Sequence, residues 1–245
     1  MKYQLLLTLA FSTCLTALPQ SKYQTIRITN DIELIKLSEN AYVHVSYSNL
    51  PKYGRYPANG LVIINGTQAL VFDSPWDDSL TATLFSWITD SMHLEVKGFV
   101  PNHWHEDCMG GLSFIKQQGI ETYANQMTID IAKSKNLPLP AHGFTDSLKL
   151  CLEDKTVECY YPGAAHTEDN IAVWIPSEQI LFAGCMIKSV QTQNLGNTAD
   201  GNLTEYPKTL EKLLRTFPKA KIVVPGHGPV GGLELIRHTK ELADM

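Results

Sequence analysis

The amino-acid sequence predicts an α/β fold of four layers, in which two sheets pack face to face and helices cover them on the outside (αββα). Runs with strand character are followed by helical runs twice along the chain. The two halves also echo each other, because FVPNHWHEDCMGGL from residue 99 and VVPGHGPVGGL from residue 223 share the order of apolar strand, proline, histidine and Gly-Gly. An echo of this kind indicates two related halves, and strands followed by helices in each favour layered sheets.

The elements of the first half follow from periodicity and turn residues. Asn65-Gly66 is typical of a hairpin turn between two strands. Apolar residues at helical spacing follow Asp78, which we expect to cap that helix, and Asn125 is expected to cap a later one that stops before Pro138. The predicted strands cover residues 32–48, 61–75 and 96–100, and the predicted helices cover residues 77–93, 111–118 and 126–137.

The second half repeats this style. Thr204 is expected to cap a helix with an apolar face, which ends near Pro218, and a last helix begins at about Leu233. The predicted strands cover residues 149–153, 156–163, 171–184 and 221–232.

Composition narrows the classes of function. With 245 residues, 44% apolar and 18% charged, the chain is of ordinary globular composition. Its net charge of −5 provides no basic surface, so we expect no nucleic-acid partner. No apolar run after the N-terminus is long enough to span a bilayer, so we expect no stable membrane insertion. Nothing in the sequence demands an oligomer, and we expect a monomer.

The N-terminus resembles a secretory signal peptide. Lys2 precedes an apolar stretch that runs from Leu5 to Leu15, and this stretch is too short for a membrane span. We assign residues 1–18 to the signal peptide, with an approximate cleavage site, and residues 19–245 to one domain exported to the periplasm. Cys14 allows a lipoprotein alternative, which Thr13 in the preceding position disfavours.

In an oxidising compartment the remaining cysteines are informative. Cys151 and Cys159 bracket a predicted hairpin with its tip at residues 154–156. They are either a cross-strand disulfide, for which the geometry is demanding, or two small apolar strand residues.

A dense group of potential metal ligands follows the strand at residues 96–100. His103, His105 and Asp107 offer two imidazoles and a carboxylate, which are donors that zinc accepts, and Gly110-Gly111 lets the chain turn sharply afterwards. A lone histidine here would more often be a satisfied surface or core residue, but the group of three favours a metal.

Three further candidates stand at strand ends or in turns, namely His166, Cys185 and His227. Six donors suit two zinc ions with three protein ligands each, which leaves open positions and therefore indicates catalysis. The remaining histidines, His44, His93, His142 and His238, are interpreted as surface or core residues.

The HxHxD-x-x-GG run with a downstream His, Cys and His resembles the metallo-β-lactamase superfamily, as do DSPWDD, PGAAHTEDN, AGCMIK and LGNTADGN. Most hydrolases of that superfamily carry a histidine where Cys108 stands and a bridging aspartate where Cys185 stands. The combination found here is similar to the zinc β-lactamases. The resemblance implies an αββα fold with the site at one edge. It implies a first zinc held by His103, His105 and His166, and a second held by Asp107, Cys185 and His227.

The resemblance also implies an activity, which is hydrolysis of the ring amide of penicillins, cephalosporins and carbapenems, conferring resistance to them. A zinc-activated hydroxide would attack the carbonyl, because zinc lowers the pKa of bound water to about 7. Asp107 would act as a catalytic residue by orienting that hydroxide. Lys188 would bind the substrate carboxylate, Asn197 would reach the carbonyl oxygen, and Asp73 would support the ligands from beneath.

Residues 46–60 are predicted to form a long hairpin loop, and the resemblance implies a mobile flap with Tyr47, Tyr53 and Tyr56 as candidates for substrate contact. Two alternatives remain open at this point. One is another hydrolase of the superfamily, acting on a thioester or a lactone. The other is an exported protein that binds zinc without catalysis.

Overall fold

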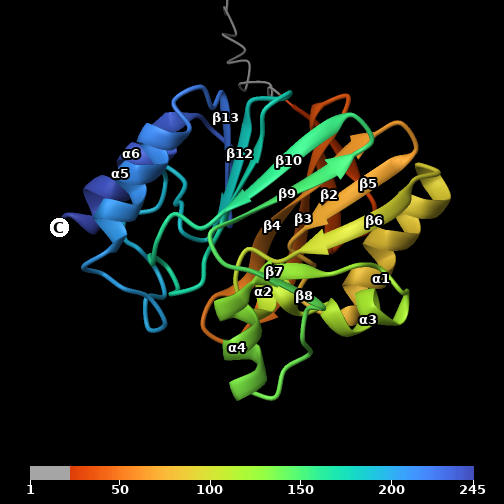
Figure 1. Cartoon of the computed structure of the whole chain (residues 1–245), viewed down its shortest axis with the longest axis horizontal. Coiled ribbons are helices and arrows are strands. Elements are labelled where there is room, and N and C mark those ends of the chain that lie inside the picture. Colours follow the sequence, from red (N-terminus) through yellow and green to blue (C-terminus); the bar gives the residue numbers. More distant parts are fainter. Residues whose placement is uncertain (1–22) are drawn as a thin grey trace, which may run out of the picture.

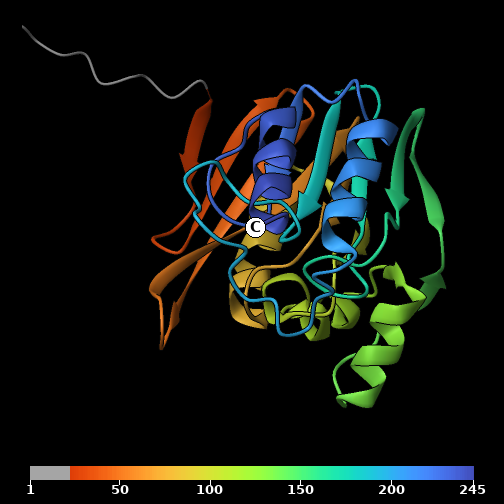
Figure 2. The ribbon, with the colours of Figure 1, turned by 90° about the vertical axis from the view of Figure 1, so that its left-hand side faces the viewer.

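The computed structural model describes residues 23–245. The predicted signal peptide, Cys14 included, lies outside the described residues. Two large sheets pack face to face, and helices cover the outer face of each, so the predicted αββα fold is confirmed (Figure 1). Viewed from the side, α5 and α6 lie together over one sheet (Figure 2).

The first sheet has six strands in the order in which they occur along the chain. Its first five strands are antiparallel, and β6 is parallel to β5 because a helix lies between them in the sequence. The strands are β1 (Gln24–Arg27), β2 (Ile32–Ser38), β3 (Ala41–Leu50), β4 (Gly54–Asn65), β5 (Gln68–Phe72) and β6 (Glu95–Val100).

The second sheet has five strands in the order β13-β12-β11-β10-β9. It repeats the plan of the first, because β9 to β12 are antiparallel and β13 is parallel to β12 at the edge. The strands are β9 (Ser147–Leu152), β10 (Lys155–Tyr160), β11 (Ala172–Ile175), β12 (Ile180–Gly184) and β13 (Ile222–Pro225), and a separate pair consists of β7 (Tyr123–Asn125) and β8 (His142–Phe144).

The helices divide between the two outer faces. Four helical segments and a π-helical turn fall in the first half, and two helices fall in the second. They are α1 (Asp78–Ser86), η1 (Trp87–Ser91), α2 (Glu106–Met109), α3 (Leu112–Gln117), α4 (Gln126–Ser134), α5 (Tyr206–Thr216) and α6 (Leu233–Ala243). The echo noted in the sequence is therefore structural, since each histidine segment follows the parallel edge strand of its own sheet.

Central strands are buried on both faces, which explains why they read as continuous apolar runs. On β4, Leu61 and Ile63 face the core between the sheets, whereas Val62 faces the core beneath α1 and α3. On β12, Phe182 lies in the core between the sheets and Leu181 lies beneath α5 and α6. The three apolar cores hold the strand ends, and hence the loops after them, in fixed positions.

The predicted hairpin loop at residues 46–60 is largely strand. β3 and β4 stay paired in register from Ala41↔Ile63 out to Leu50↔Gly54, and only residues 51–53 form a turn. Arg55 near the end of this hairpin hydrogen-bonds to Asp31 and lies over the ring of Tyr47, so the extended ribbon is tied back to the rest of the sheet.

The disulfide considered for Cys151 and Cys159 is not formed, and no disulfide occurs within residues 23–245. The hairpin turns at residues 153–154, one position earlier than predicted, so Cys151 lies opposite Thr156 and Cys159 lies opposite Leu148. Cys151 is exposed and Cys159 is buried between the sheets, so the register keeps the two thiols apart.

Two predicted helix caps shift by a residue or two. Asp77, not Asp78, caps α1 by accepting a hydrogen bond from the backbone of Leu80. Thr204 does not cap α5, because the N-cap position falls on Glu205, which makes no side-chain capping hydrogen bond; the side chain of Asn202 accepts from the backbone N–H of Glu205 just before the helix. Asn125 caps α4 as predicted, by accepting from the backbone of Met127.

A nearly buried ion pair ties the two sheets together. Lys155 at the start of β10 donates to Glu178 at 3.0 Å and to the backbone oxygen of Ile64 on β4 at 3.2 Å. Glu178 also accepts from the side chain of Asn40. Burial raises the pKa of Glu178, but the hydrogen bonds from Lys155, Ser38 and Asn40 outweigh it and leave the pKa below its ordinary value.

We predict that Glu178→Gln lowers the free energy of unfolding of the metal-free protein at pH 7 by about 1–2 kcal/mol, because the charged hydrogen bonds are lost at a partly solvated site. The folded pKa lies below the unfolded one, so this stabilisation is present above the unfolded pKa and is lost as pH falls through the folded pKa. Urea unfolding should therefore show a difference between wild type and variant that shrinks from pH 7 to pH 4. A difference that stays constant would contradict the assignment.

Candidate metal centre

A cavity of about 810 Å³ opens at the edge of the sandwich where loops from both sheets meet. The tip of the β3–β4 hairpin lies along one side of it, and the segment from residue 192 to 200 lies along another. Of the six predicted ligands, four line this cavity, namely His105, Asp107, His166 and His227. His103 and Cys185 are fully or almost fully buried.

The first half of the chain contributes three of the candidate ligands directly after β6. His103 and His105 lie in the loop that leaves the strand, and Asp107 lies in the first turn of α2. A Cβ on Gly110 would overlap the backbone oxygen of Trp76, and one on Gly111 would overlap Thr81 of α1. The Gly-Gly therefore permits a close approach that brings this short segment against the preceding helix.

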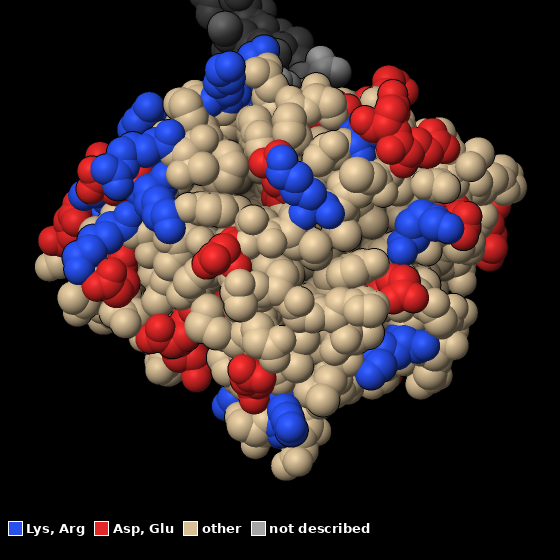
Figure 3. Space-filling model, viewed as in Figure 1, with Lys and Arg blue, Asp and Glu red and all other residues tan. Residues whose placement is uncertain are grey.

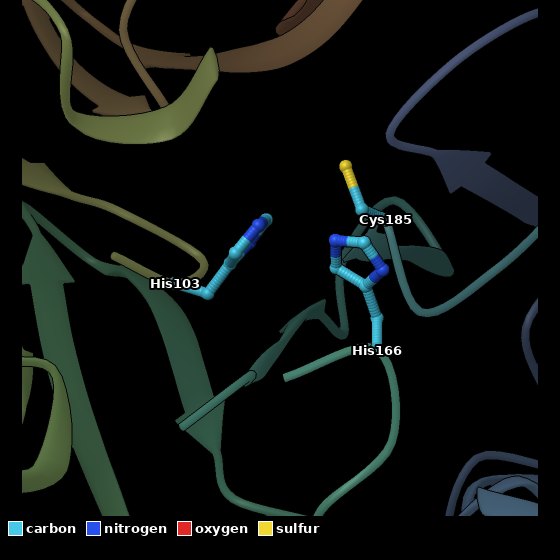
Figure 4. A group of neighbouring side chains, drawn as sticks. All are labelled: His103, His166 and Cys185. Atoms are coloured by element: carbon cyan, nitrogen blue, oxygen red, sulfur yellow. The ribbon is translucent and has the colours of Figure 1, made fainter. Parts of the chain in front are cut away.

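The second half delivers the other three from separate loops. His166 lies in the segment between β10 and β11, Cys185 directly follows β12, and His227 follows β13. Figure 4 shows how His103, His166 and Cys185, which are far apart in the sequence, lie as neighbours. One ligand atom from each of these three lies within 4.8 Å of the other two.

Asp107, Cys185 and His227 form a compact triangle. Asp107 Oδ2 lies 3.2 Å from Cys185 Sγ and 3.2 Å from His227 Nε2, and the sulfur is 3.2 Å from the same nitrogen. Donors bound tetrahedrally to one zinc ion at ordinary bond lengths stand about 3.3–3.6 Å apart. The three donors therefore fit a single zinc ion with little movement.

The three histidines predicted for the other ion also converge. His103 Nε2 lies 3.0 Å from His105 Nδ1, and the ring centroids of His103, His105 and His166 are 4.6, 5.0 and 5.2 Å apart. The Nδ1 atom of His166 is buried and has no hydrogen-bond partner within residues 23–245. A buried imidazole without a partner for this nitrogen, in a ring close to two other imidazoles, fits a metal-binding site.

Three of the four histidines have their second nitrogen held by another group. His103 Nδ1 lies 3.2 Å from Cys108 Sγ, His105 Nε2 lies 3.0 Å from Asp200 Oδ2, and His227 Nδ1 lies 2.7 Å from the backbone oxygen of Pro57. Partners of this kind fix ring orientation and tautomer in metal sites. Sequence reasoning missed Asp200 and Pro57, because only the fold brings them near.

The charges of the cluster suit a cation. Burial opposes ionisation of Asp107, but the hydrogen bond from His227 and the proximity of His103 bring its pKa well below the ordinary value. A hydrogen bond with Cys108 lowers the pKa of Cys185 despite burial. Burial lowers the pKa of His103 to about 3, so its imidazole is neutral. An anionic carboxylate, an acidified thiol and a neutral imidazole are the forms that bind metal. His227 differs, because Cys185 and Asp107 raise its pKa well above the ordinary value despite burial, so its imidazole would release a proton on binding a metal.

The residues predicted to contact the substrate or support the site differ in their burial and hydrogen bonds. Lys188 lines the cavity, is 8% exposed, and donates to the backbone oxygen of Cys185 at 2.7 Å. Asn197 also lines the cavity but is exposed, and its Oδ1 accepts from the backbone of Ala199 at 3.2 Å. Asp73 lies beneath the cluster, where it accepts from the backbone of Asn102, and burial raises its pKa.

The three tyrosines of the hairpin behave differently. The Tyr56 ring lies 4.9 Å from the His227 ring, and Tyr53 lies 5.4 Å from Tyr56 at the cavity. Tyr47 lies beneath Arg55 and does not line the cavity. Two of the three candidates are therefore placed to contact a bound molecule.

The other histidines lie outside the clusters found within residues 23–245. His44 is buried with its Nε2 3.0 Å from the backbone oxygen of Asp73, and burial lowers its pKa to about 4. His142 is exposed beside Glu121 and His93 is exposed, whereas His238 contacts the backbone of Thr192. Their interpretation as surface or core residues agrees with these positions.

One face of the molecule carries charges of both signs. On the face drawn in Figure 3, the basic side chains over α5 and α6 are interspersed with acidic ones. None of the helices in the described part of the chain has the length and apolar character needed to cross a membrane.

Comparison with known proteins agrees with this geometry. The family model described as the metallo-beta-lactamase superfamily matches residues 53–227. The metallo-beta-lactamase type 2 of Bacteroides fragilis is 48% identical over 222 residues, which cover 91% of this chain and 89% of that one. The metallo-beta-lactamase type 2 of Bacillus cereus is 35% identical over 214 residues, which cover 87% of this chain and 83% of that one. The metallo-beta-lactamase from Pontibacter korlensis has a TM-score of 0.84 at 35% identity, covering 87% of this chain and 99% of that one. The chain is thus a member of the metallo-β-lactamase superfamily.

Proposed function

We propose that the chain hydrolyses the ring amide of β-lactam antibiotics in a metal-dependent reaction. One observation carries the proposal. Asp107, Cys185 and His227 lie 3.2 Å from one another beside three converging histidines, at the base of a cavity large enough for a small molecule. The relatives named above as metallo-beta-lactamases, one of them 48% identical, support the same reaction.

We further propose that the metal is zinc and that two ions bind. His103, His105 and His166 would hold one, and Asp107, Cys185 and His227 would hold the other. Imidazole, thiolate and carboxylate together match the donors zinc takes. Bound zinc supplies Lewis acidity, which makes water a nucleophile at neutral pH and stabilises developing negative charge. Three protein donors for each ion leave room for water and substrate.

Residues of the chain orient the reactants. Asp107 stays ionised because its pKa is low, so its carboxylate can accept a hydrogen bond from the attacking water and fix its direction. Lys188 provides an ammonium group at the cavity wall for the carboxylate that β-lactams carry. Asn197 uses its side-chain oxygen in a local turn, which leaves its amide N–H groups to donate to the lactam carbonyl oxygen.

We propose that the protein acts in the periplasm as a monomer, with residues 1–18 as its signal peptide. The support is the sequence of the N-terminus, in which Lys2 precedes a short apolar stretch. Export would place the enzyme where cell-wall antibiotics act.

Removal of the metal tests the function. The zinc-loaded protein should hydrolyse a carbapenem, lose this activity on treatment with a chelator and regain it when zinc is added back. Loss of the ring amide can be followed by ultraviolet absorbance. Absence of turnover of any penicillin, cephalosporin or carbapenem by fully loaded protein would overturn the proposal, and turnover of a thioester or a lactone instead would establish the alternative hydrolase.

Replacement of Lys188 tests substrate binding. Lys188→Ala should raise KM for carboxylate-bearing β-lactams by about 10-fold or more, because a charged hydrogen bond at a largely desolvated site is removed. Lys188→Arg, which keeps the charge, should raise KM by a smaller factor than Lys188→Ala. The matched control is the methyl ester of the same antibiotic, for which KM should change little. An unchanged KM for the free carboxylate would show that Lys188 does not bind it.

A further inference from the structure

A buried amide from the first sheet holds the segment that carries His227. Asn59 lies on β4 and is 4% exposed. Its Nδ2 donates to the backbone oxygen of Pro225 at 2.9 Å and to that of Gly228 at 2.8 Å. The two acceptors lie on either side of His227, so the Asn59 side chain binds this segment at both of its ends.

The backbone of β4 adds two contacts to the same segment. The N–H of Asn59 donates to the oxygen of Gly226 at 2.8 Å, and the oxygen of Pro57 lies 2.7 Å from His227 Nδ1. Each of the residues from 225 to 228 therefore has a hydrogen bond to β4. This strand belongs to the first sheet, whereas His227 follows the edge strand of the second.

Within its own sheet the segment is held mainly through Gly184. Gly226 and Gly228 flank His227, and Gly228 adopts a positive φ of 82° that favours glycine. Gly226 donates to the oxygen of Gly184 at 2.7 Å, and a Cβ on Gly226 would overlap Cys185 Sγ. Glycine thus allows the close approach to the thiol but leaves the backbone free to adopt other conformations.

We propose that Asn59 is a positioning residue for His227. By clamping residues 225–228 from the opposite sheet, Asn59 fixes the imidazole of His227 against Asp107 and Cys185. An asparagine suits this role because its amide has two N–H donors, and both are used against carbonyl oxygens. Aspartate has the same shape but would place acceptors against acceptors. The inference rests on the proposed role of His227 as a ligand of the second zinc.

Asn65 provides a matched control on the same strand. Its Nδ2 also bridges the two sheets, donating to the backbone oxygen of Leu152 at 2.8 Å and to Asp154 at 2.7 Å. It lies six residues further along β4, about 20 Å away at ~3.3 Å per residue. Its loss should weaken the contact between the sheets without touching the metal centre.

The first measurement is zinc affinity by competition with a chromophoric chelator. Asn59→Ala should weaken the second zinc by about 10- to 100-fold, the usual effect of removing a group that orients a ligand, and leave the first zinc unchanged. Asn59→Ser, which keeps one donor, should bind the second zinc with an affinity between those of the wild type and the alanine variant. Asn65→Ala should bind both ions as the wild type does. Equal effects of Asn59→Ala and Asn65→Ala, or no effect of either, would overturn the proposal.

The second measurement needs no metal. In the metal-free protein, ¹⁵N NMR of the histidine rings should show Nδ1 of His227 protonated and in a single environment, because it donates to Pro57. Asn59→Ala should broaden or shift this signal, and Asn65→Ala should not. If wild type binds no second zinc but the His227 signal responds as stated, the proposed second zinc site fails while the role of Asn59 in holding His227 stands. An unperturbed His227 signal in a folded Asn59→Ala or Asn59→Ser variant would contradict the clamp itself.

Discussion

The site depends on buried hydrogen bonds that cross from one sheet to the other. Asn59 reaches from β4 to the segment around His227, and Asn102 reaches from the end of β6 to Ile171, whose N–H it accepts at 2.9 Å. Asp169 in turn accepts from the backbone of Trp104 at 3.0 Å. Buried polar groups are costly when unpaired, so these bonds hold the two halves in one relative position. That position brings the six candidate donors, which come from four separate segments, close together at one edge of the sandwich.

The packed layers of the fold hold the segments that carry the candidate donors. All candidate ligands but His166 come shortly after a strand end or begin a short helix, and the strands are fixed by apolar cores on both faces. The glycines beside the candidate ligands, such as Gly226 and Gly228 around His227, allow the backbone to approach its neighbours closely but do not make it rigid. Orientation comes from groups outside the ligand set, such as Asp200 behind His105 and Pro57 behind His227. A rigid scaffold with adjustable loops is a common arrangement for catalytic sites.

Sequence reasoning predicted the layers and gathered the six candidate ligands because both depend on local patterns. Apolar runs define buried strands, and a histidine after a strand end with glycines beside it marks a loop at the sheet edge. The contributions of Asn59, Asp169 and Asp200 could not be predicted in this way, since each acts on a residue from 65 to 169 positions distant. The pairing of Cys151 and Cys159 depended on a register that shifts with a single turn residue.

In the proposed site, donors from both sheets form two metal positions, of which one depends on a thiolate. The most direct test is the zinc content at saturation of the wild type and of Cys185→Ser, determined by elemental analysis of the folded proteins. We expect two zinc ions per chain in the wild type and one in the variant, because serine is a poor substitute for a thiolate in binding zinc. Equal zinc content in the two proteins would show that Cys185 does not hold a zinc ion.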